Sequence, residues 1–227
     1  MDDLLGNVFW HALTGPQARH AVGSGGARRY APGFSPLLAF ADPQSPDFAA
    51  LRPCCAAGER FYCSDWSGAS PDGWRIELEA TMFRMVWAGA LPPADEGLDA
   101  IRLGPQHSAQ AVELAELTHP GPFGPRTPEL GEYYGVFEGG RLVAMAGERA
   151  HAGALREISA VCTHPGHQGR GLARRLMNHL IRRQAARGEV PFLHVMRSNV
   201  HAHALYARMG FRHHAEPVVR VVSAPAA

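Results

Sequence analysis

One stretch, residues 157–180, constrains most strongly what this chain can fold into. Residues 155–163 form a short apolar-rich run that is typical of a buried strand, and Pro165 and Gly166 end it. From Leu172 onward, apolar residues recur on one face of a predicted helix while arginines occupy the other face. The stretch therefore predicts a strand, a glycine-bearing loop and a helix, in that order.

The loop between this strand and this helix suits an anion. The first amide N–H groups of a helix have no partner within the helix, and that end carries a partial positive charge. Small residues at Gly169, Gly171 and Ala173 would let a phosphate approach the backbone closely. The same residues are also compatible with a tight turn that binds nothing, so the loop alone leaves both interpretations open.

The basic residues narrow the choice of phosphate ligand. The chain contains no lysine, because all 22 of its basic residues are arginine. This excludes lysine-dependent ATP sites and Schiff-base chemistry. A dinucleotide fingerprint would need an acid about twenty residues after its glycines, closing a second strand. Glu189 instead follows the end of the predicted helix, so a nucleotide-binding redox domain is a poor alternative.

Two motifs resemble those of a known superfamily. Gln168-x-x-Gly171-x-Ala173 looks like the acetyl-CoA signature Q/R-x-x-G-x-G/A of the GNAT N-acetyltransferases. Residues 199–211 resemble the second signature, N-x-x-A-x-x-L-Y-x-x-x-G-F, as in the FR47-like branch. The resemblance covers residues 100–222 and is weak or absent before them. It implies an α/β fold with a mixed sheet, the GNAT acyl-CoA N-acyltransferase fold.

The predicted organisation has two parts joined by a Pro-rich linker at residues 91–97. Residues 1–95 would form a divergent N-terminal α/β lobe, comparable to a degenerate GNAT-like half, and residues 99–222 the GNAT N-acetyltransferase domain. In that domain, residues 217–222 are expected to return as the hairpin partner of the preceding strand. The resemblance also implies that the strands on either side of the helix part, leaving an opening for the pantetheine arm of the cofactor.

The resemblance assigns cofactor contacts to both motifs. The pyrophosphate would lie on the backbone amides of residues 168–173, with Arg170 and Arg174 as charge partners. The pantetheine would lie along residues 161–163, where the N–H of Cys162 would polarise the thioester carbonyl. The predicted cofactor-binding residues are Val161, Cys162, Thr163, Gln168, Gly169, Arg170, Gly171, Leu172, Ala173, Arg174, Asn199, Ala202 and Tyr206.

Two catalytic roles follow from the resemblance. Tyr206 is the predicted proton donor to the departing thiolate, because a phenol near pKa 10 suits that step. Glu157 is the predicted base or amine-orienting group, with an ordered water as the alternative base. Asn199 is compatible with a helix cap, a pantetheine contact or both. A strand-buried Cys162 is expected to be inert rather than an acyl-carrying nucleophile.

These roles predict an acetyl-CoA-dependent N-acetyltransferase acting on a primary amine of a small molecule or peptide, by direct attack in a ternary complex. Alternatives are another acyl-CoA, an amino-acid acceptor such as glycine, and a CoA-binding regulatory protein that has lost catalysis. The loop at residues 118–126, with three prolines and two glycines, is either an exposed connector or a substrate-facing segment.

Composition limits the other partners. The formal net charge is +1 with no long basic run, so a nucleic-acid surface is not expected. The spacing of Cys54, Cys55 and Cys63 matches no common zinc pattern, and no metal is expected. No stretch suits a membrane span or a signal peptide, and the cysteines favour a reducing, cytoplasmic location. Acetyl-CoA and an amine acceptor are the predicted partners, and a homodimer stays open.

Overall fold

The computed structural model describes residues 2–226. The elements up to residue 87 are α1 (Asp2–Gly6), α2 (Val8–Thr14), β1 (Ala21–Val22), β2 (Ala27–Tyr30), β3 (Leu37–Phe40), α3 (Phe48–Leu51), β4 (Arg60–Ser64) and β5 (Arg75–Trp87). The later elements are β6 (Ile101–Arg102), α4 (Ser108–Thr118), β7 (Tyr133–Glu138), β8 (Arg141–Ala152), β9 (Leu155–Thr163), α5 (Leu172–Ala186), β10 (Val190–Met196), α6 (Val200–Arg208), β11 (Phe211–Ala215) and β12 (Val218–Ser223). Short 3-10 turns are η1 (Ala18–His20), η2 (Arg52–Cys54), η3 (Pro105–His107), η4 (Thr127–Leu130) and η5 (Pro165–His167).

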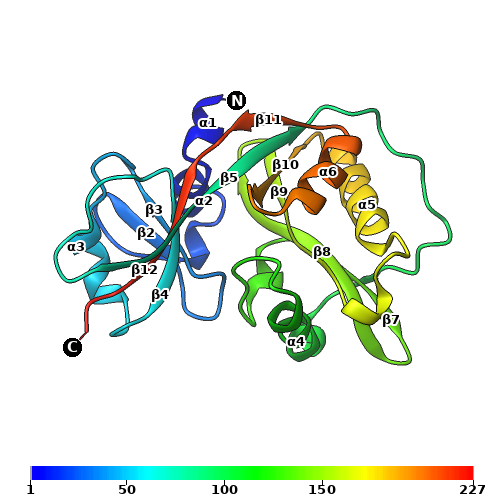
Figure 1. Ribbon diagram of the computed structural model, residues 1–227, viewed down its shortest axis with the longest axis horizontal. Helices are drawn as coiled ribbons and strands as arrows, with labels where there is room; N and C mark the ends of the chain where they lie inside the picture. The colour runs from blue at the N-terminus through cyan, green and yellow to red at the C-terminus, as the bar shows by residue number, and fades with distance from the viewer. Residues whose placement is uncertain (1, 227) are drawn as a thin grey trace.

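One sheet runs through the whole molecule (Figure 1). Among residues 2–226 it has 12 strands in the order β1-β2-β3-β4-β12-β5-β10-β9-β8-β7-β6, with β11 also paired to β5. The β3–β4 and β9–β10 pairs are parallel and the other pairs are antiparallel. The prediction of an α/β fold with a mixed sheet is therefore confirmed.

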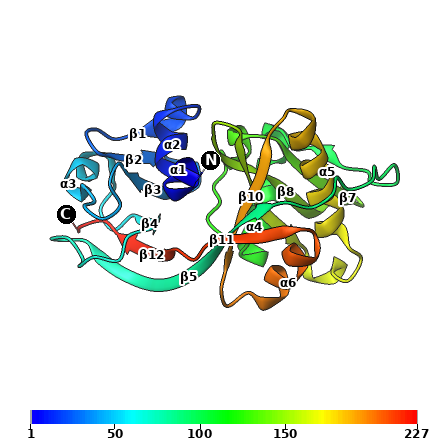
Figure 2. The ribbon, with the colours of Figure 1, turned by 90° about the horizontal axis from the view of Figure 1, so that it is seen from above.

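Strand β5 joins the two lobes, as Figure 2 shows from above. It is 13 residues long; residues 75–81 pair with β12, whereas residues 82–87 pair with β10 and β11. The pairing of strands therefore crosses the sequence boundary expected at residues 95–99. Residues 82–85 of β5 are buried, and the second half of the strand pairs with β10 along one edge and with β11 along the other.

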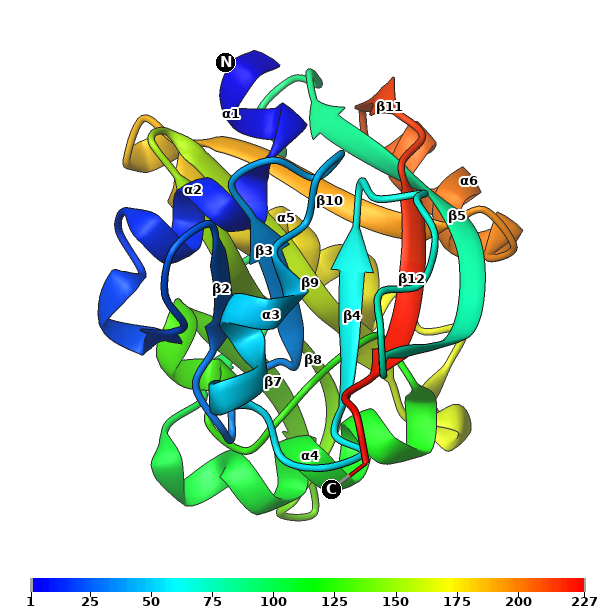
Figure 3. The ribbon, with the colours of Figure 1, turned by 90° about the vertical axis from the view of Figure 1, so that its left-hand side faces the viewer.

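The expected hairpin at the end of the chain is wrong. Strand β12 does not return along β11; it pairs with β4 and with the first half of β5 (Figure 3). The reason is the length of β5, whose second half is already paired with β11. After Pro217 the chain continues along the same edge of β5 and so enters the N-terminal lobe.

Helices cover both faces of the C-terminal half of the sheet. Helices α5 and α6 pack on one face over a core that includes Leu176, Met177, Ile158 and Tyr206. Helix α4 covers the other face, where its core meets Cys162. Helix α2 contacts β8 and β3, so the N-terminal lobe packs directly on the C-terminal half.

Candidate functional site

Strands β9 and β10 part at the centre of the sheet. Their parallel pairing covers only residues 155–157 of β9 and 190–192 of β10, ending at Glu157 and Phe192. Beyond this point β9 pairs only with β8, and β10 pairs only with β5, among the described residues. The parting that the resemblance implied is therefore present, and the edge of β9 that faces the opening has no strand partner there.

A bulge in β9 lies beside the opening. The register with β8 shifts by one residue between Ser159 and Cys162, and Ala160 has a φ of 52°, which is uncommon for a residue with a side chain. After the bulge, Val161 packs toward α5 and α6, whereas Cys162 packs toward α4. Side chains alternate between the faces of any strand, and the extra residue of the bulge shifts this alternation, so Ile158 and Val161, three residues apart, face the same layer.

A cavity of about 440 Å³ occupies the opening and extends onto the N-terminal lobe. At one end its walls come from β9, β10 and α6, and they include four predicted cofactor residues: Val161, Asn199, Ala202 and Tyr206. At the other end its walls come from β3, β4, β5 and β12 and from residues 119–122, which belong to the Pro-rich loop. The substrate-facing interpretation of that loop agrees with this position.

Tyr206 lies in the cavity wall on α6 and is 8% exposed. Burial raises the pKa of its phenol to about 12. The hydroxyl therefore keeps its proton throughout the physiological pH range, although as a weaker acid than a free tyrosine. On the same helix, the Oδ1 of Asn199 accepts a hydrogen bond from the amide of Ala202 at 3.1 Å, which confirms the cap.

Glu157 is buried outside the cavity lining, in contact with two residues that do line it. Arg149 donates to both carboxylate oxygens, at 2.6 and 2.9 Å, and the Nδ1 of His194 lies 2.8 Å from Oε1. Burial acts to raise the pKa of Glu157, but Arg149 and His194 outweigh it and lower that pKa to about 2. In this arrangement Glu157 is a structural anion, and a base role would require it to leave the ion pair.

The polar cluster continues from His194 into the N-terminal lobe. Arg84 on β5 donates its Nε–H to the Nε2 of His194 at 2.9 Å, and its Nη2 donates to Asp65 at 2.8 Å. Because arginine can only donate, Nε2 of His194 is the acceptor, and its Nδ1–H donates a hydrogen bond to the Oε1 of Glu157. Burial lowers the pKa of His194, which keeps the ring neutral. Phe9 of α2 stacks on this ring, with 5.4 Å between the two ring centroids.

The glycine loop and the start of α5 have the conformation that the anion hypothesis needs. Gly169 and Gly171 have φ values of 78° and 73°, in the left-handed region that favours glycine. No atom lies within 4 Å of a Cβ placed on Gly169, so that side of the loop is open. Arg170 pairs with Glu138 at 2.6 Å on the surface, whereas Arg174 projects its Nη2 to within 3.7 Å of the Cβ position of Gly171.

Cys162 has the surroundings of an inert thiol. It is 7% exposed, and burial raises its pKa to about 11. Its side chain belongs to the core beneath α4 rather than to the cavity. A thiol that stays protonated in an apolar layer is a poor nucleophile.

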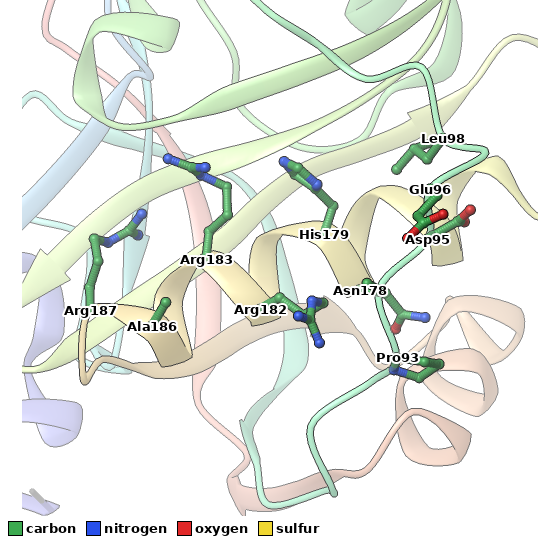
Figure 4. A pocket seen from close by; sticks show the side chains of 11 residues that line it. Pro93, Asp95, Glu96, Leu98, Asn178, His179, Arg182, Arg183, Ala186 and Arg187 are labelled. Atoms are coloured by element: carbon green, nitrogen blue, oxygen red, sulfur yellow. The ribbon is translucent and has the colours of Figure 1, made fainter.

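A second hollow, of about 420 Å³, lies between α5 and residues 93–98 (Figure 4). The figure shows Arg182, Arg183 and Arg187 along the helix, and Pro93, Asp95 and Glu96 on the linker beside it. The charges of the arginines are already engaged: Arg183 and Arg187 pair with Glu132, and Arg182 donates to the carbonyl of Pro92 at 2.8 Å. This hollow contains none of the predicted site residues.

Two features are absent from residues 2–226. No helix there is both long and apolar enough to cross a bilayer. No group of three or more histidine, cysteine, aspartate or glutamate side chains is arranged in that range to hold a metal ion.

Comparison with known proteins identifies the family. A solved structure from Novosphingobium aromaticivorans, assigned to the GNAT family of acetyltransferases, is 36% identical, with a TM-score of 0.89 over 98% of this chain and 99% of that one. The chain belongs to the GNAT family. A family model described as FR47-like protein matches residues 133–221.

Two other proteins mark the extent of the similarity. The N-alpha-acetyltransferase RimI of Mycobacterium tuberculosis is 38% identical over 84 residues, which are 35% of this chain and 51% of that enzyme. The chain thus matches about half the length of this curated relative. A GCN5-related N-acetyltransferase-like protein from Streptococcus suis shares the fold, with a TM-score of 0.62 at 17% identity over 94% of this chain and 92% of that one.

Sequence reasoning missed the polar cluster that begins at Glu157. Arg149 on β8 and His194 on β10 contact Glu157 directly. Arg84 on β5 contacts His194, and Asp65, the residue after β4, contacts Arg84. One signal was present in the sequence: His194 is the only polar residue in the apolar run Pro191–Met196. A single polar residue in a buried strand indicates a partner, but not where in the chain that partner lies.

Proposed function

We propose that this chain transfers the acetyl group of acetyl-CoA to a primary amine by direct attack in a ternary complex. The observation that carries the proposal is the parting of β9 and β10 after Glu157 and Phe192, with a cavity in the opening. One end of this cavity holds predicted cofactor residues, and the other reaches the N-terminal lobe. Both substrates therefore have a place in one continuous space.

The residues present fit acetyl-CoA. The open, left-handed glycines of the loop and the first amides of α5 suit a pyrophosphate, with Arg174 beside them. The unpaired edge of β9 near Val161 suits the amides of a pantetheine arm. When bound, acetyl-CoA supplies an activated acetyl thioester.

The chain provides positioning and a proton. Tyr206 presents a neutral hydroxyl to the cavity and is the proposed proton donor. Backbone N–H groups of β9 near Cys162 are the proposed donors to the developing oxyanion. Because Glu157 is tied to Arg149 and His194 is engaged by Arg84, an ordered water is the proposed base for the amine.

The test is an acceptor screen that follows CoA release from acetyl-CoA across monoamines, amino acids, polyamines, aminoglycosides and peptides. The expected result is acceptor-dependent release and an acetylated amine identified by mass spectrometry. Calorimetry with acetyl-CoA alone provides the control. Binding of acetyl-CoA with no acetylation of any amine would contradict acetyl transfer. A melting temperature that rises with NAD(P) but not with acetyl-CoA would contradict acetyl-CoA as the donor.

A further inference from the structure

One row of side chains forms the floor of the cavity on the N-terminal lobe. Leu37 on β3 is the Cα partner of Tyr62 on β4, Tyr62 is the partner of Val221 on β12, and Val221 is the partner of Leu78 on β5. Residues directly opposite each other across a sheet project from the same face. All four line the cavity, so four adjacent strands present one continuous apolar surface to it.

This apolar row is open to a ligand at its β5 end. Leu37 and Val221 are 5% and 6% exposed, whereas Leu78 is 49% exposed. Leu78 thus leaves half of its surface uncovered at the rim of a cavity whose floor is already apolar. An apolar group bound on the row would remove that surface from water, which favours binding.

The charges of the lining limit what the acceptor can carry. Among the described lining residues, the full charges are those of Arg60 and Arg149, and there is no carboxylate. Arg60 pairs with Glu77 at 2.5 Å, and Arg149 with Glu157. Because both arginines already hold their glutamates, a second ammonium group on the acceptor would lose hydration without finding a carboxylate on the walls.

We propose that the acceptor is a monoamine joined to an aliphatic or aromatic body, which lies on the Leu37–Tyr62–Val221–Leu78 row. This inference rests on the proposed function and specifies its substrate class. Polyamines and aminoglycosides, which carry several ammonium groups, are then poor acceptors. The N-terminal lobe, outside the region of motif resemblance, sets the choice of amine.

The first experiment uses the full chain and matched amines. CoA release is measured with ethylamine, butylamine and hexylamine, and with 1,6-diaminohexane, which has the length of hexylamine and a second charge. The kcat/KM is expected to rise about fourfold per added methylene, and the kcat/KM for hexylamine is expected to exceed that for the diamine by about tenfold or more. A kcat/KM that does not change with chain length, or one that is equal for the diamine and hexylamine, would overturn the inference while leaving acetyl transfer intact.

The second experiment changes the floor itself. Leu78→Asp is expected to lower kcat/KM for hexylamine about tenfold and to reduce the ratio of kcat/KM between hexylamine and 1,6-diaminohexane. The KM for acetyl-CoA should stay unchanged. The matched control is Leu91→Asp, because Leu91 is 54% exposed but lies in the linker, away from the cavity. Equal effects of the two substitutions would refute the row as the acceptor surface. If no amine is acetylated at all, the proposed function fails and the inference fails with it.

Discussion

The Nδ1 of His194 lies 2.8 Å from the Oε1 of Glu157, at the point where their strands separate. Glu157 is the last β9 residue paired with β10, and His194 lies two residues beyond Phe192, the last β10 residue paired with β9. With Arg149 on β8 and Arg84 on β5, the pair connects four adjacent strands beneath the opening. We infer that this buried cluster holds the shape of the opening.

Replacing Glu157 should therefore affect stability first. Glu157→Gln leaves Arg149 buried without its anion, and breaking a buried pair in this way costs about 3–5 kcal/mol. We expect a loss of this size in the free energy of unfolding, measured by denaturant titration. Glu129→Gln is the control, because it removes an exposed pair with Arg126 and should change the denaturation midpoint little.

The acid dependence of stability gives a second readout for the same variant. The pKa of Glu157 is about 2 when folded and about 4.5 when unfolded, so its contribution is present above pH 4.5 and is lost as pH falls toward 2. Wild-type protein should thus lose stability over this range more steeply than Glu157→Gln. If the variant keeps its stability but loses kcat, the residue acts as the catalytic base instead.

More of the site could be predicted from the sequence in the C-terminal half of the chain than in the N-terminal half. The loop glycines, Asn199 and Tyr206 belong to local motifs, whose conformation depends on neighbours within a few residues. Arg84 meets His194 across 110 positions of sequence, and no local period encodes that pairing. The same applies to β12, which reaches the N-terminal lobe because β5 is long enough to pair with two strands in succession.

Tyr206→Phe should lower kcat by about a hundredfold, since it removes the proposed proton donor and keeps the ring. The KM for acetyl-CoA should stay within a few fold, because the ring still fills the cavity wall. Tyr133→Phe is the control: its hydroxyl is buried with no hydrogen-bond partner among the described residues, so its removal should be neutral or stabilising. Unchanged kcat in Tyr206→Phe would assign the proton donation to another group.

Cys162→Ala separates transfer to the amine in one step from transfer through the enzyme. The thiol lies in the layer beneath α4 with a pKa of about 11, so kcat should remain within a few fold of wild type. A small loss of stability, about 1–2 kcal/mol, is expected from the space left in that core. Loss of turnover, or an acetylated wild-type enzyme trapped by mass spectrometry without amine, would show instead that Cys162 carries the acetyl group.

The role of the glycine loop can be separated from its conformation by a pair of matched substitutions. Gly171 and Gly188 precede and follow the same helix, with φ values of 73° and 72°, and neither has an atom within 3.4 Å of its Cβ position. Alanine at either position should cost roughly 1–2 kcal/mol of stability from left-handed strain. Only Gly171→Ala should also raise the Kd for acetyl-CoA, measured by calorimetry, because only that residue lies in the predicted pyrophosphate loop. If both variants bind acetyl-CoA equally well, the loop is a tight turn and the anion lies elsewhere.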